Sequence, residues 1–163
     1  MKVPQTKVLL AVQTAILFVG TVFAWSKLIP QLTNFYALYG TFFRVSDCVV
    51  PNPFVTACLY GSLAFIVALF WSVRVYLAPS YARERYLRNF LVFCVAFAGS
   101  VVVSEAGEYY HWYSSAVSVT CSPGVSPLQT PCFTGLIFFA CACTAAWCIA
   151  HLWPIDTRQQ EYH

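Results

Sequence analysis

Four long stretches of this sequence are almost free of charged residues, and they constrain the fold more than any other feature. They cover residues 8–25, 54–77, 89–104 and 132–153. Arg74 and His151, each near one end of its stretch, are the only basic or acidic residues within them. About 20 helical residues cross the hydrocarbon core of a bilayer, and lipid offers no partner for an unpaired backbone group. The sequence therefore predicts four transmembrane helices in a single membrane domain, residues 1–163.

Composition supports a membrane environment. Of the 163 residues, 60% are hydrophobic and only 9% are charged, whereas a soluble domain has about 25% charged residues. A soluble fold of this size could not bury so much apolar surface. The formal net charge of +3 comes from residues at the ends of the apolar stretches, so the expected partner is the lipid bilayer and no nucleic-acid partner is expected.

The distribution of Lys and Arg predicts the orientation. One side would carry Lys2, Lys7, Arg83, Arg85, Arg88 and Arg158, and the other side only Lys27 and Arg44. Cytoplasmic loops are enriched in these residues, so both termini and the segment 78–88 are predicted to be cytoplasmic. A cleavable signal peptide ending near Ala24-Trp25-Ser26 is an alternative interpretation of the first stretch.

The segments that lead into the second and fourth stretches match each other. Pro53, Thr56, Cys58 and Gly61 align without a gap with Pro127, Thr130, Cys132 and Gly135, and another cysteine precedes each set. The match predicts two two-helix repeats, at about 8–77 and 89–153, in parallel orientation. The threonines are candidate helix N-caps. The glycines, like the pair Gly20-x-x-x-Ala24, predict close approach of a neighbouring helix.

The predicted fold class is an all-α membrane protein, a four-transmembrane-helix bundle with short amphipathic segments on its outer face. Residues 28–43 have apolar side chains at helical spacing, which predicts a separate helix in the outer interface. Its counterpart at 108–119 is rich in Tyr and Trp, which favour the headgroup region.

Eight cysteines fall into two groups. Cys48, Cys58, Cys121 and Cys132 lie at the outer ends of the stretches, in extracytoplasmic loops; Cys94, Cys141, Cys143 and Cys148 lie within them. The repeat predicts the disulfides Cys48–Cys58 and Cys121–Cys132. Each would close a loop of about ten residues and stabilise the fold by roughly 3 kcal/mol, although four cysteines allow other pairings.

With its predicted spans, its inside termini and a cysteine pair in each outer loop, the layout resembles the bacterial inner-membrane disulfide-generating oxidoreductases. The resemblance implies that Cys48/Cys58 and Cys121/Cys132 would pass electrons to a quinone. That family uses a Cys-x-x-Cys pair, which this sequence lacks. The wider spacing here favours structural disulfides over a redox couple.

A second polar feature follows the third stretch. Glu105, Glu108 and His111 are spaced three apart, so on a helix they would share a face and could bind a cation or relay protons. Alternatively, the acids mark the end of the span, or Glu105 pairs with Arg44 or Lys27. Cys141, Cys148 and His151 also share a face, but they are too few for a metal site, so no metal is expected.

These features favour a non-catalytic membrane protein, either a subunit or a small binding module, with other membrane subunits or a second copy as partners. No cofactor is expected, although the aromatic content of 18% could line a site for a lipid, quinone or pigment. The alternatives are the quinone-linked thiol–disulfide oxidoreductase and a small-solute transporter. A transporter would need a polar cavity built from Gln13, Thr14, Ser62, Ser72 and Ser100.

Overall fold

The computed structural model describes residues 3–41, 53–112 and 126–152, and its described residues fold into helices without strands. The long helices are α1 (Val3–Tyr39), α2 (Ala57–Leu77), α3 (Tyr81–Tyr109) and α4 (Pro131–Leu152). Two 3-10 turns, η1 (Pro53–Val55) and η2 (Pro127–Gln129), precede α2 and α4. All four long helices are long and apolar enough to cross a membrane, which confirms the prediction of helices without strands in the described residues and of four helices able to span a bilayer.

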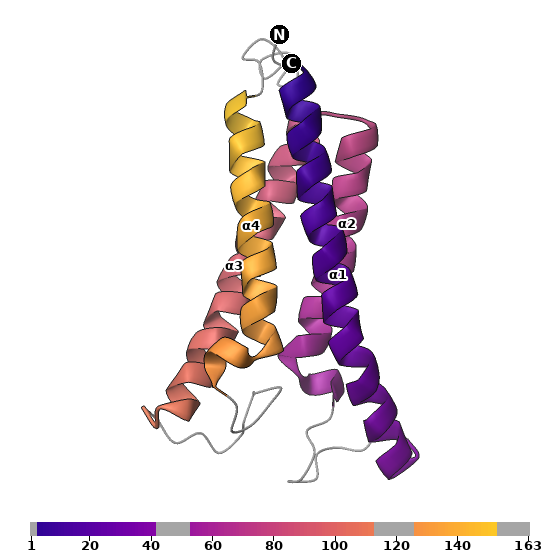
Figure 1. The fold of residues 1–163 in the computed structure, drawn as a ribbon, viewed down its shortest axis with the longest axis vertical. Coiled ribbons are helices and arrows are strands. Elements are labelled where there is room, and N and C mark those ends of the chain that lie inside the picture. Colours follow the sequence, from indigo (N-terminus) through magenta and orange to yellow (C-terminus); the bar gives the residue numbers. More distant parts are fainter. Residues whose placement is uncertain (1–2, 42–52, 113–125, 153–163) are drawn as a thin grey trace.

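Successive helices run antiparallel and form a bundle that widens toward one end (Figure 1). The start of α1, the end of α4 and the short α2–α3 connection lie at the narrow end, and η1 and η2 lie at the wide end. α1 packs along both α2 and α4, and α3 packs along α4, whereas α2 and α3 contact each other less. The bundle is therefore closed on three sides and loosest between α2 and α3.

The first helix is longer than the sequence predicted. α1 continues unbroken through 37 residues, so the prediction of a separate interfacial helix at 28–43 is wrong. Pro30 lies inside α1 and removes the hydrogen bond that an N–H at this position would donate to the Ser26 carbonyl, but the helix continues through it to Tyr39. Two apolar residues of this segment, Leu28 and Phe35, are buried against the protein, whereas Ile29, Tyr36 and Leu38 are exposed.

The third helix also extends beyond its apolar stretch. The segment 78–88, predicted as a polar loop, is mostly the first two turns of α3, which begins with the Glu84 N–H donating to the Ser80 carbonyl at 3.1 Å. The helix ends with His111 in the left-handed conformation, φ 56°. The Trp112 N–H then donates to the Gly107 carbonyl at 2.9 Å, the six-to-one bond of a Schellman motif.

The two 3-10 turns have the same local geometry. Thr56 and Thr130 each donate a hydroxyl hydrogen bond of 2.8 Å to the carbonyl of the proline three residues earlier. Of the two predicted N-caps, Thr130 makes a capping bond, accepting the Phe133 N–H at 3.3 Å. Thr56 occupies the N-cap position of α2 without a side-chain capping bond. Most of the second predicted amphipathic segment, residues 113–119, lies outside the described residues.

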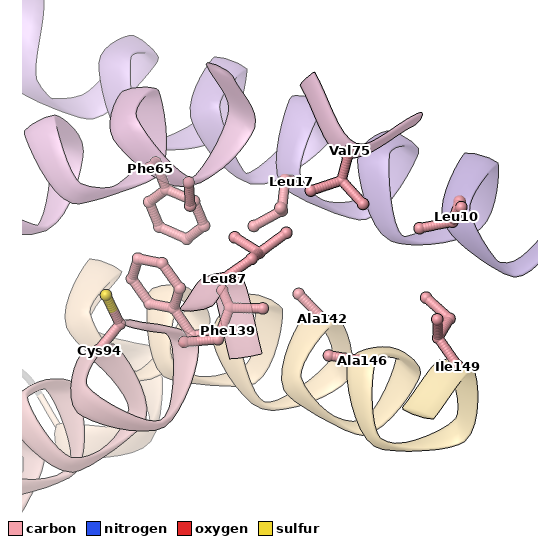
Figure 2. Close-up of a cluster of buried hydrophobic side chains, with 12 residues drawn as sticks. Leu10, Leu17, Phe65, Val75, Leu87, Cys94, Phe139, Ala142, Ala146 and Ile149 are labelled. Carbon is pink, nitrogen blue, oxygen red and sulfur yellow. The ribbon is translucent and has the colours of Figure 1, made fainter. Parts of the chain in front are cut away.

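The apolar core fills the narrow half of the bundle with side chains from all four helices (Figure 2). Leu10 and Leu17 of α1 meet Val75 of α2, Leu87 of α3 and Ile149 of α4. At the wide end of this cluster, the Phe65 and Phe139 rings stack at 3.9 Å with an interplanar angle of 11°. Beyond this stacked pair the helices diverge.

Candidate functional site: an apolar cavity in the wide half of the bundle

A cavity of about 590 Å³ lies in the wide half of the bundle, within the range of ~300–1,000 Å³ typical of ligand sites. All four helices line it, through residues 23–28 of α1, 57–65 of α2, 90–104 of α3 and 131–139 of α4. Its walls are mainly aromatic and aliphatic. Most of the described lining residues belong to α2 and α3, which contact each other less than the other sequence-adjacent helices do.

The stacked Phe65–Phe139 pair separates this cavity from the packed core. Both rings line the cavity and both belong to the core cluster. Phe65 is held on its other side by Gly20, where an added Cβ would lie 2.5 Å from the ring. The close approach predicted at Gly20 is therefore made by a side chain of α2, and it restricts where the Phe65 ring can lie.

The repeat glycines have a different role from the one predicted. A Cβ added at Gly61 would meet nothing within 4 Å, and one added at Gly135 would meet only the Phe65 ring, at 3.7 Å. Neither position brings two helix backbones close together, so that prediction is wrong. Both glycines line the cavity, because the helices diverge at this level, and the missing side chains leave space there.

Of the described residues that line the cavity, Lys27 is the only charged one. Its ammonium nitrogen lies 5.8 Å from the centroid of the Phe23 ring, which also lines the cavity. Among the described residues, no hydrogen bond or ion pair involves the Lys27 side chain, and no acidic side chain lines the cavity. The site therefore combines an apolar interior with a single positive charge.

The cysteines at the start of α2 and α4 also reach the cavity. The Cys58 and Cys132 sulfur atoms lie 3.9 Å apart, almost twice the S–S bond length of about 2.05 Å. Cys132 is present as a thiol, so the predicted Cys121–Cys132 disulfide is not supported. Cys48 and Cys121 lie outside the described residues, and no two described cysteines lie at disulfide distance.

Glu105 is buried beside these cysteines. Its Oε2 atom accepts a hydrogen bond of 2.8 Å from the Thr130 hydroxyl, and its Oε1 atom has no partner among the described residues. The structure therefore pairs Glu105 with Thr130, and Lys27 does not pair with it; the other predicted partner, Arg44, lies outside the described residues.

The predicted polar group of Glu105, Glu108 and His111 does not share a helical face. Glu105 and Glu108 belong to α3, but the helix ends at Tyr109. His111 is exposed and left-handed, so the spacing of three no longer places it above the two acids. No group of three His, Cys, Asp or Glu side chains suited to a metal occurs in the described part of the chain.

Glu84 provides a second buried carboxyl group, near the narrow end of the bundle. The sequence patterns did not predict it. Glu84 and Gln13 are both fully buried, and the Gln13 amide donates to Glu84 Oε1 at 3.4 Å. Gln13 Oε1 and Glu84 Oε2 have no partner among the described residues. The sequence did contain a signal, since Glu84, Leu87, Leu91 and Cys94 follow the helical spacing of one buried face.

The remaining candidates do not form a site. Cys141, Cys148 and His151 are exposed on α4, so they face away from the bundle. The polar residues proposed for a transporter are divided: Thr14 and Ser72 hydrogen-bond to each other at 2.8 Å, away from the cavity. Ser62 and Ser100 line the cavity, but their hydroxyls donate to backbone carbonyls of their own helices.

Comparisons with known proteins give no match: no protein-family model, no curated protein and no solved structure matches this chain. Function is therefore inferred from the cavity and the residues around it.

Proposed function

We propose that this protein is a small membrane binding module that holds a membrane-soluble, largely apolar ligand in the cavity between α2 and α3. The observation that carries the proposal is the cavity itself, with its volume of about 590 Å³ and its walls from all four helices. An apolar space of this size is unfavourable to water. A ligand drawn from the bilayer would fill it and restore the lost packing contacts.

The distribution of charge supports an orientation with the cavity in the outer half of the membrane. Lys7, Arg74, Arg83, Arg85 and Arg88 belong to the ends of α1, α2 and α3 that meet at the narrow end. The positive-inside rule then places the narrow end and the chain termini in the cytoplasm, and the cysteine-bearing turns outside. The matching turns before α2 and α4 support a bundle built from two parallel two-helix repeats.

The outer surface supports an environment of lipid or of other membrane subunits. Large apolar side chains such as Phe18, Phe70, Phe93 and Trp147 are exposed on all four helices. Acyl chains would cover them in an isolated copy, and partner helices would cover part of them in a complex. A role as a subunit is therefore compatible with ligand binding.

The geometry favours binding over the thiol–disulfide alternative. Reactive cysteines need an environment that stabilises the thiolate, such as neighbouring positive charge. Cys132 instead lies in an apolar wall with the Glu105 carboxyl group beside it. Neither the apolar wall nor a carboxyl group supplies the positive charge that activates a cysteine, so the Cys58–Cys132 contact is better explained as packing.

Filling the cavity tests the proposal. Gly61→Leu places a side chain in the open space, whereas Gly99→Leu is the matched control, because a Cβ there also meets nothing within 4 Å and Gly99 does not line the cavity. The purified full chain in nanodiscs is photolysed with a diazirine-bearing long-chain alcohol, and labelled peptides are mapped by mass spectrometry.

We expect saturable labelling of cavity residues in the wild type and in Gly99→Leu, and loss of that labelling in Gly61→Leu. Circular dichroism melting is the control that checks whether both variants are folded. Equal labelling of the two leucine variants, or labelling confined in the wild type to exposed residues that do not line the cavity, such as Phe18, Phe70 and Trp147, would refute the proposal.

A further inference from the structure

We propose that the ligand is an anionic amphiphile, a carboxylate or phosphate on a long apolar chain, whose acidic group is bound by Lys27. This inference rests on the proposed function, since it assigns the chemistry of the ligand to the same cavity. It follows from the charge and the donors that the described residues place around the cavity.

The charge of the cavity is unbalanced. Lys27 contributes a positive charge to the lining, and none of the lining residues in the described part of the chain is acidic. Glu105 lies beside the cavity residue Cys132. It is buried and accepts a hydrogen bond from Thr130. The Lys27 side chain is exposed, so it lies at the rim of the cavity, where its charge meets an apolar space and no acidic partner among the described lining residues. An anionic group on the ligand would supply the missing charge.

The donors of the cavity point to the same chemistry. The hydroxyls of Ser62 and Ser100 already donate to the backbone carbonyls of Cys58 and Phe97, each within its own helix. The ammonium group of Lys27 carries three donors, and no hydrogen bond within the described residues uses them. Carboxylates and phosphates are acceptors with several oxygens, so they match a group of unused, charged donors.

The position of Lys27 separates the polar contact from the apolar one. Lys27 lies two turns along α1 from Gly20, which holds the Phe65 ring at the inner limit of the cavity. The aromatic ring of Phe23, between them in sequence, lies beneath the ammonium group at 5.8 Å. The headgroup would therefore contact Lys27, and the chain would extend inward along the aromatic walls toward Phe65 and Phe139.

The experiment compares competitors that share one chain and differ in headgroup. The photoreactive alcohol is the probe, because it is neutral and does not depend on Lys27. Oleate at alkaline pH, oleyl phosphate and oleyl alcohol are each titrated against it with the full-length protein in nanodiscs of uncharged lipid. We expect both anions to compete about tenfold more strongly than the alcohol, as one charge-assisted hydrogen bond predicts.

Variants of Lys27 identify the source of that preference. Lys27→Gln should lose the preference for anions while competition by oleyl alcohol stays unchanged, and Lys27→Arg should keep it. Lys7→Gln, at the narrow end of the same helix, is the control for net charge and should behave like the wild type. A stronger effect of oleyl phosphate than of oleate would identify a phospholipid-like ligand, and the reverse a fatty acid.

The inference is overturned if oleyl alcohol competes as well as the anions in the wild type, or if Lys27→Gln keeps the preference. Either result leaves the binding proposal intact as long as the neutral probe still labels the cavity and Gly61→Leu still prevents it. Loss of that labelling pattern would instead refute the proposed function, so the two failures give different results.

Discussion

Replacing Gly20 with alanine tests the packing that separates the core from the cavity. The added Cβ would lie 2.5 Å from Cε1 of Phe65, 3.1 Å from Cδ1 and 3.2 Å from Cζ. Carbon atoms pack best at ~3.5–4.0 Å, so the ring must move by about 1 Å. It cannot move freely, because Phe65 is buried and stacks on Phe139 at 3.9 Å.

The expected cost can be separated from the general effect of changing glycine to alanine in a helix. Overpacking of this kind costs about 1–3 kcal/mol, and the better helix propensity of alanine offsets up to about 1 kcal/mol. Gly135→Ala gives the same propensity gain but places its Cβ 3.7 Å from the same ring, an ordinary contact. The two variants should therefore differ by about 1–3 kcal/mol in free energy of unfolding.

Unfolding of the purified protein in mixed micelles, titrated with sodium dodecyl sulfate and followed by circular dichroism, measures this difference. Combining Gly20→Ala with Phe65→Leu should recover part of the loss, since the shorter side chain leaves room for the new methyl group. If Gly20→Ala proves as stable as Gly135→Ala, then Phe65 does not rest on Gly20, and the described boundary between core and cavity is wrong.

Three further substitutions have definite expected outcomes in the same unfolding assay. Glu84→Gln should be at least as stable as the wild type, because the new amide can donate a hydrogen bond to Gln13 Oε1. Glu84→Ala should lose about 2–5 kcal/mol of unfolding free energy through the cavity that it leaves. Equal stability of the two variants would show that Glu84 is not buried. Thr130→Val removes the hydroxyl that donates to Glu105 and should cost about 1–3 kcal/mol, a result contradicted by an unchanged unfolding midpoint. His111→Gly should stabilise the end of α3 by about 0.5–1 kcal/mol, because glycine adopts a positive φ without steric cost; destabilisation would argue against the left-handed conformation.

The presence of the four helices could be predicted from the sequence, but their ends could not. An apolar stretch marks the part of a helix that lies in lipid. The helix can continue beyond that stretch where its residues are polar or partly buried. α1 therefore passes through Pro30, and α3 begins eight residues before the apolar stretch at Asn89. Glu84 was missed because its polarity suggested a loop, although its spacing from Leu87 and Leu91 fits the buried face.

The cavity could not be predicted from sequence patterns. It depends on how the α1–α2 and α3–α4 pairs pack against each other, through contacts such as the Phe65–Phe139 stack, and no local motif specifies these contacts. The motif Pro-x-x-Thr-x-Cys-x-x-Gly correctly marked the start of α2 and α4, yet the roles assigned to Gly61, Gly135 and Cys132 were not supported. Those roles depend on the contacts that each residue makes with the other helices, and the local sequence does not specify these contacts.

The length of α1 has a consequence for how the protein sits in a bilayer. At 1.5 Å per residue, its 37 residues measure about 55 Å, whereas a bilayer with its headgroups is ~40–45 Å thick. At the average tilt of about 20° the helix would still cover about 52 Å along the membrane normal. At this tilt, one end of α1 would extend beyond the headgroups, where water-soluble molecules could contact it.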